Sequence, residues 1–177
     1  MTRNVRDAAI VAIRYQAGEP IDTRLSDIVA HLRQCNVKLE GFVQRLRQRE
    51  NRSRCDMLLE DLGSGQLVDI TEDRGPLSRG CRLDVGALLA AMAKVRNNGL
   101  AKCDLLVINK FGKTEAEGGG FRPLVADALE RGVKVLIAVP ATNLIVWQQF
   151  AGDMAVEFDT AAITADPEMA CRQLGLI

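Results

Sequence analysis

The sequence has no excess of charge of either sign, because 23 lysines and arginines are balanced by 23 aspartates and glutamates. No overall field therefore draws the protein to nucleic acid or to an anionic membrane, and an anion site has to be local. A long hydrophobic run is also missing, since the apolar stretch at residues 8–13 is too short to span a membrane or to direct secretion. We expect a cytoplasmic protein whose partners include neither a membrane nor nucleic acid.

The sequence also lacks the cysteine and histidine patterns of common disulfide and zinc frameworks. Its five cysteines are an odd number, and no pair has the CxxC spacing of a zinc ribbon. The sole histidine, His31, falls in a predicted helix without a second histidine at ligand spacing. No GxSxG motif indicates a serine nucleophile. Reduced thiols and a structural histidine are therefore expected.

What the sequence does contain is an alternation of apolar strands and amphipathic helices. With 47% hydrophobic residues, 177 residues can bury one core, which predicts a single domain over residues 1–177. Strands are expected at residues 8–13, 37–46, 54–61, 66–71, 105–109, 133–139 and 154–158, and helices at 23–34, 84–95, 121–131 and 144–151. The helix at 84–95 has Asp84 as its expected cap, and the turn at 63–65 closes an antiparallel hairpin. This order predicts an α/β fold with a largely parallel sheet.

The apolar strand at 105–109 is followed directly by a polar, glycine-rich loop. In a parallel α/β sheet, ligands bind beyond the carboxyl ends of the strands, where this loop is expected. Lys110 and Lys113 would supply positive charge beside Asn109, and the amides of Gly118, Gly119 and Gly120 would form a donor nest before the next helix. The alternative is that the lysines are solvated and the glycines permit a tight turn. Both interpretations stay open.

Two acidic residues of the same loop, Glu115 and Glu117, would repel an anion unless they pair with the lysines. Ion pairing is therefore the role predicted for them. As a catalytic acid–base pair they would need a mutual placement that their spacing does not establish.

A second cationic loop contains Arg74, Arg79 and Arg82 next to glycines and a proline. Guanidinium groups there would suit a phosphate or another tetrahedral oxyanion, although surface ion pairs are the commoner role of such arginines. Cys55 and Cys81 each have arginine neighbours, which lower a thiol pKa and favour a thiolate that binds a soft metal. The alternative for these two cysteines is a small buried hydrophobic side chain.

The order of elements and three segments, RCDMLLEDLGSGQ at 54–66, RGCRLD at 79–84 and NKFGKTEAEG at 109–118, carry a resemblance. The chain resembles a bacterial family of uncharacterised proteins related to P-loop nucleoside-triphosphatases and often encoded near molybdate-transport genes. The resemblance spans nearly the whole chain. It implies a three-layer P-loop NTPase-like fold with an antiparallel hairpin insertion, and a connection to molybdenum or its oxyanion.

The chain departs from the active P-loop enzymes at two places. Their GxxxxGK[ST] loop (Walker A) corresponds to residues 14–23, which keep one glycine and have no lysine. Glu19 would repel phosphate, and Pro20 lacks an amide donor. Where those enzymes end a later strand in magnesium-binding acids (Walker B), this chain has Asn109 and Lys110. Magnesium is therefore not an expected cofactor.

Three functional hypotheses follow. The leading one is a non-hydrolysing binding protein for an oxyanion, with molybdate and tungstate as candidates, or for a nucleotide phosphate, linked to molybdenum handling or regulation. The first alternative is a divergent nucleoside-triphosphatase in which Lys110 or Lys113 replaces the missing lysine. The second is a noncatalytic interaction module or homo-oligomer that uses the arginine-rich stretch at 45–54 or an apolar helix face.

Overall fold

The strands form one sheet, as the computed structural model shows for the residues it describes, 5–47, 56–70 and 84–177. The sheet has seven strands in the order β4-β3-β2-β5-β6-β1-β7. They are β1 (Ile10–Tyr15), β2 (Leu39–Arg47), β3 (Asp56–Asp61), β4 (Leu67–Asp69), β5 (Leu105–Ile108), β6 (Lys134–Pro140) and β7 (Ala155–Asp159). The five strands from β2 to β7 along this order are parallel, whereas β3 and β4 pair antiparallel. The predicted parallel sheet with an antiparallel hairpin is thus confirmed.

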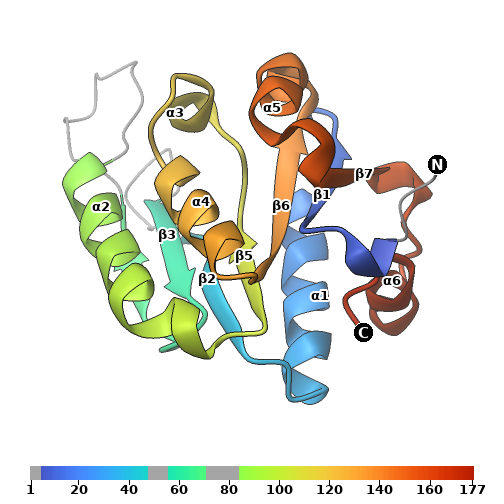
Figure 1. Cartoon of the computed structure of the whole chain (residues 1–177), viewed down its shortest axis with the longest axis horizontal. Helices are drawn as coiled ribbons and strands as arrows, with labels where there is room; N and C mark the ends of the chain where they lie inside the picture. The colour runs from blue at the N-terminus through green and yellow to red at the C-terminus, as the bar shows by residue number, and fades with distance from the viewer. Residues whose placement is uncertain (1–4, 48–55, 71–83) are drawn as a thin grey trace.

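Helices cover both faces of the sheet and make three layers (Figure 1). The helices are α1 (Ile21–Gln34), α2 (Val85–Lys94), α3 (Lys113–Ala116), α4 (Arg122–Glu130), α5 (Leu144–Ala151) and α6 (Pro167–Gln173). On one face, α2, α4 and α5 pack on side chains such as Ile10 and Leu106. On the other face, α1 and α6 pack on their strand neighbours Val11 and Leu105. Because successive strand side chains point to opposite faces, each central strand contributes to two cores.

Two short helices were not predicted from the sequence. The four-residue α3 lies inside the loop that follows β5, where an irregular segment was expected. The carboxyl-terminal α6 begins with Pro167 after Asp166, whose side chain accepts a hydrogen bond from the Met169 amide. This is an ordinary helix start that the sequence does contain. The Asp84 cap of α2 is confirmed, because its side chain accepts from the Ala87 amide at 2.9 Å.

The close approach of β2 and β5 positions the candidate site and depends on Gly41. This residue has a φ of +102° and pairs with Val107 across the two strands. A Cβ at position 41 would lie 2.0 Å from the Val107 carbonyl oxygen, so only glycine fits. The pairing continues to Phe42 and Ile108, and it therefore brings the next residues of both strands to the same edge of the sheet. In the described residues, no helix combines the length and the apolar character needed to cross a membrane.

Candidate functional site

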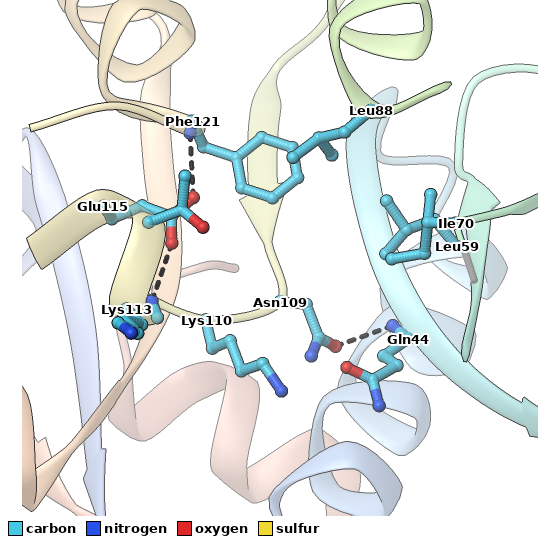
Figure 2. A pocket seen from close by; sticks show the side chains of 11 residues that line it. Gln44, Leu59, Ile70, Leu88, Asn109, Lys110, Lys113, Glu115 and Phe121 are labelled. Carbon is cyan, nitrogen blue, oxygen red and sulfur yellow. Dashed lines mark hydrogen bonds between the residues drawn. The ribbon is translucent and has the colours of Figure 1, made fainter. Parts of the chain in front are cut away.

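A cavity of about 260 Å³ lies beyond the carboxyl end of β5, between the β5–α4 connection and the hairpin side of the sheet. Figure 2 shows its two kinds of wall. The apolar wall is formed by Leu59, Ile70, Leu88 and Phe121. The polar wall consists of the carboxyl end of β5 with the following loop, and of one residue of β2. This is the place that the sequence predicted for a ligand. Of the loop residues singled out there, Asn109, Lys110, Lys113 and Glu115 line the cavity, whereas the three glycines at 118–120 are not among its lining residues.

Asn109 joins three parts of the chain at the polar wall. Its side chain is buried, and its Oδ1 accepts a hydrogen bond of 2.7 Å from the Gln44 amide of β2. Its Nδ2 donates to Asp22 Oδ1 in the first turn of α1, at 3.2 Å. Asn109 therefore ties β5 to β2 and to α1. Sequence reasoning missed Gln44 and Asp22, because only the tertiary structure brings them to Asn109.

The two lysines of the loop have different surroundings. Lys113 is exposed and pairs with Glu117 one helical turn away, at 3.7 Å. Lys110 is half-buried, and its side chain extends along the polar wall toward the Asn109 side of the cavity (Figure 2). In the part of the chain that the structure describes, the Lys110 ammonium group has no hydrogen bond or ion pair. Lys110 is therefore the cation that stays available to a ligand.

Among the described residues, Glu115 has no ion pair of the kind that the sequence predicted. Its carboxylate is buried and accepts hydrogen bonds from two main-chain amides, Gly112 at 2.8 Å and Phe121 at 2.9 Å. Gly120 has a φ of +58°, and a Cβ there would lie 1.9 Å from Glu115 Oε1. The glycine thus makes room for the carboxylate. The predicted ion pair occurs for Glu117. The Glu115 side chain instead stabilises the loop by hydrogen bonds to main-chain amides.

The expected donor nest is altered at two of its three amides. The Gly118 amide donates to the Glu115 carbonyl at 3.1 Å, and the Gly119 amide donates to the Thr114 carbonyl at 2.9 Å. Both donors are thus used inside the turn, as the tight-turn alternative expected. Because none of the three glycines is among the described lining residues, an anion in this cavity has to be held by other groups.

The β1–α1 loop, which the sequence resemblance matched to the phosphate-binding loop of the active enzymes, contains a hydrogen bond to its own glutamate. The Glu19 carboxylate accepts a hydrogen bond from the Gln16 amide, and the Glu19 amide donates back to the Gln16 carbonyl at 3.2 Å. Pro20 precedes α1 and has no amide hydrogen to offer. A second cavity of about 450 Å³ borders this loop, but its cation, Arg14, already pairs with Asp159 at 2.8 Å. Glu19, Gln16 and Arg14 therefore already have partners within the protein.

The arginine-rich stretch at 45–54 is described only at its start. Arg45 donates to Glu60 Oε2 from Nε at 2.9 Å and from Nη2 at 2.7 Å, and Arg33 pairs with the same carboxylate at 2.9 Å. Burial alone would raise the Glu60 pKa, but the hydrogen bonds and charges of the two arginines outweigh it and lower the pKa below its usual value. Arg45 is therefore committed to the protein. Residues 48–55 lie outside the described part.

Four of the predicted site residues also lie outside the described residues: Arg79, Arg82, Cys55 and Cys81. Within the described residues, no three histidine, cysteine or acidic side chains are grouped as metal ligands. Burial raises the pKa of both Cys103 and Cys171 to about 11, with smaller electrostatic contributions, so these two are protonated thiols at neutral pH.

The fold defines a class: a three-layer α/β domain with a mostly parallel sheet of the kind found in P-loop nucleoside-triphosphatases. One solved structure, titled "Solution Structure of a Human Cancer-Related Nucleoside Triphosphatase", matches with a TM-score of 0.64 and 19% identity over 93% of each chain. At that identity the likeness shows the fold alone, and it confirms the expected P-loop NTPase-like architecture.

The chain itself belongs to the family described as "Protein of unknown function (DUF2478)", whose model matches residues 10–165. It is also 34% identical over 143 residues to the molybdenum import ATP-binding protein ModC 2 of Bradyrhizobium diazoefficiens. This match covers 81% of the chain but only 16% of that protein, so the chain spans about a sixth of its relative's length. The resemblance to a family related to P-loop enzymes is thereby confirmed.

Proposed function

We propose that this chain is a non-hydrolysing binding domain for a small anionic ligand, which the cavity at the carboxyl end of β5 holds through Lys110. The observation that carries the proposal is the ammonium group of Lys110, which lines the cavity without a partner among the described residues. A half-buried ammonium group has lost part of its hydration. An anion that binds beside it restores the lost interactions through a charge-assisted hydrogen bond and so stabilises the charged form.

Binding without hydrolysis is favoured by how the neighbouring groups are used. Magnesium-dependent hydrolysis needs carboxylates or hydroxyls that are free to coordinate the ion. Here Asn109 stands at the end of β5, and the Asp22 carboxylate accepts a hydrogen bond from it. In the β1–α1 loop, the Glu19 carboxylate accepts the hydrogen bond of the Gln16 amide, so this amide is not free for a phosphate. A nucleotide phosphate bound at Lys110 would therefore stay intact.

The candidate ligands are an oxyanion such as molybdate or tungstate and a nucleotide phosphate. The similarity to part of a molybdenum import ATP-binding protein supports a role linked to molybdenum handling or its regulation. The arginines at 79 and 82 are proposed as further cationic groups. Their segment follows Ile70, which lines the cavity, and ends before Asp84, whose amide donates to the Ile70 carbonyl at 2.9 Å.

A thermal-shift experiment tests the proposal with wild-type protein, Lys110→Met and the matched control Lys102→Met, which changes an exposed lysine that does not line the cavity. Each is mixed with molybdate, tungstate, sulfate, phosphate, ADP or ATP, with and without magnesium. A ligand at one hundred times its Kd raises the free energy of unfolding by about 2.7 kcal/mol, which corresponds to about 5–10 °C for a domain of this size. We expect that shift without magnesium, in wild type and Lys102→Met but not in Lys110→Met.

Two other results would contradict the proposal. Magnesium-dependent stabilisation by ATP together with phosphate release would indicate a divergent nucleoside-triphosphatase. No response to any ligand would favour the interaction module. One observation supports that second candidate: Val85 and Leu89 lie one turn apart on α2 and are 52% and 55% exposed. An exposed apolar pair of this kind suits a protein partner.

A further inference from the structure

We infer that the ligand of the Lys110 cavity is an organic anion, with one acidic group joined to a single apolar ring, rather than a bare inorganic oxyanion. The inference rests on the proposed function, since it concerns the same cavity, and it narrows the class of ligand. Its basis is the contrast between the two walls.

The apolar wall belongs to the main hydrophobic core. Leu59, Ile70, Leu88 and Phe121 come from β3, the end of β4, α2 and the start of α4, and all are buried members of one core cluster. Phe121 also packs against Phe42, with ring centroids 5.6 Å apart. The wall is therefore part of the packed core. Ligand pockets for organic molecules have this composition, mostly apolar with a few placed polar groups.

Among the described lining residues, few side-chain donors of the polar wall stay free for an inorganic oxyanion. The Gln44 amide donates to Asn109, and the Gly112 amide donates to Glu115, so these two main-chain donors are in use. Asn109 itself is engaged through both side-chain groups. An inorganic oxyanion would turn some of its oxygens toward the apolar side chains, which offer no donors, whereas an organic anion would place its ring there. An inorganic oxyanion would be poorly held here.

Three polar side-chain groups stay without partners among the described lining residues. They are the Lys110 ammonium, the Gln44 side-chain amide and the Thr114 hydroxyl. The one cation and the two neutral groups of the protein would suit a ligand that has one acidic group and a neutral polar substituent beside it. The buried Glu115 carboxylate lines the same cavity and disfavours a second acidic group on the ligand. A volume of about 260 Å³ lies just under the usual range for drug-sized ligands, which limits the body to about one ring.

Isothermal titration of the full chain with a matched probe series tests this inference. The probes are phenyl phosphate, benzoate, benzyl alcohol, inorganic phosphate and molybdate. We expect phenyl phosphate or benzoate to bind at least tenfold more tightly than inorganic phosphate, molybdate and benzyl alcohol. The tighter of phenyl phosphate and benzoate identifies the acidic group.

Variants assign the binding to the two walls. Lys110→Met is expected to weaken the organic anion at least tenfold. Leu88→Ala removes apolar wall surface and is expected to weaken it several-fold, whereas Leu89→Ala changes an exposed neighbour on the same helix and leaves the affinity unchanged. The probe comparison on the wild-type protein holds even if Leu88→Ala fails to fold.

The outcomes separate the two proposals. If phosphate or molybdate binds at least as tightly as phenyl phosphate, and Lys110→Met abolishes that binding, the organic-anion inference is wrong and the proposed function stands. If no anion binds, the proposed function is wrong and the inference falls with it. If benzyl alcohol binds as tightly as benzoate, the cavity selects an apolar ring alone and the role of Lys110 is refuted.

Discussion

The buried carboxylate of Glu115 gives the clearest quantitative test of how the loop is built. It accepts one hydrogen bond from Gly112 and one from Phe121, and the second is fully buried. Hydrogen bonds to a charged group contribute about 1.5–3 kcal/mol each, and a buried amide left without an acceptor costs about 1–3 kcal/mol. Relief of the carboxylate's own desolvation offsets part of this sum. We expect Glu115→Ala to lower the free energy of unfolding by about 3 kcal/mol.

Urea unfolding of wild type, Glu115→Ala and Glu117→Ala measures this difference directly. Glu117 is the matched control, because its ion pair with Lys113 is exposed and contributes at most about 0.5 kcal/mol. Formate, the smallest carboxylate, is expected to fill the vacated position and to raise the unfolding midpoint of Glu115→Ala but not of wild type. Equal midpoints for the two variants would refute the idea that the Glu115 carboxylate holds the turn.

Three further changes have defined outcomes. Gly41→Ala places a Cβ against the Val107 carbonyl at a positive φ, and calorimetry is expected to show at least about 3 kcal/mol of lost stability. Glu60→Gln removes the partly exposed pairing with the arginines and is expected to lower the free energy of unfolding by about 1 kcal/mol at pH 7. Because the folded-state pKa of Glu60 is lowered, the difference from wild type should shrink as pH falls below about 4.5. A pH-independent difference would contradict the pairing. Asn109→Asp turns a hydrogen bond to Asp22 into a carboxylate pair, so stability should fall by about 2 kcal/mol and magnesium-dependent phosphate release should stay absent, as a phosphate assay will show.

The fold was predictable because local and long-range signals agree. Apolar strands alternate with amphipathic helices, and the predicted cap at Asp84 and turn at 63–65 both occur. The short α3 was not predictable in the same way, since four residues carry too little periodicity to be recognised. The carboxyl-terminal α6 was missed although Asp166 and Pro167 are ordinary signals for a helix start.

The candidate site was predictable only where one segment carries it. Asn109 and Lys110 follow a buried strand, and a strand end is where a ligand is expected. Gln44 lies 65 residues from Asn109, and their contact depends on the register of β2 against β5. The role of Glu115 depends in the same way on where the turn places two amides. Spacing along the sequence does not contain that information.

The most direct test of the central claim is an amide NMR titration of wild-type protein and Lys110→Met with phenyl phosphate and molybdate, each without magnesium. The account predicts that one of these anions shifts amides around Gln44 and from Asn109 to Thr114, at the carboxyl ends of β2 and β5, and that Lys110→Met abolishes the shifts. Shifts centred on Gln16 and Glu19 would place the anion in the β1–α1 loop and contradict the account, as would a spectrum that neither anion changes.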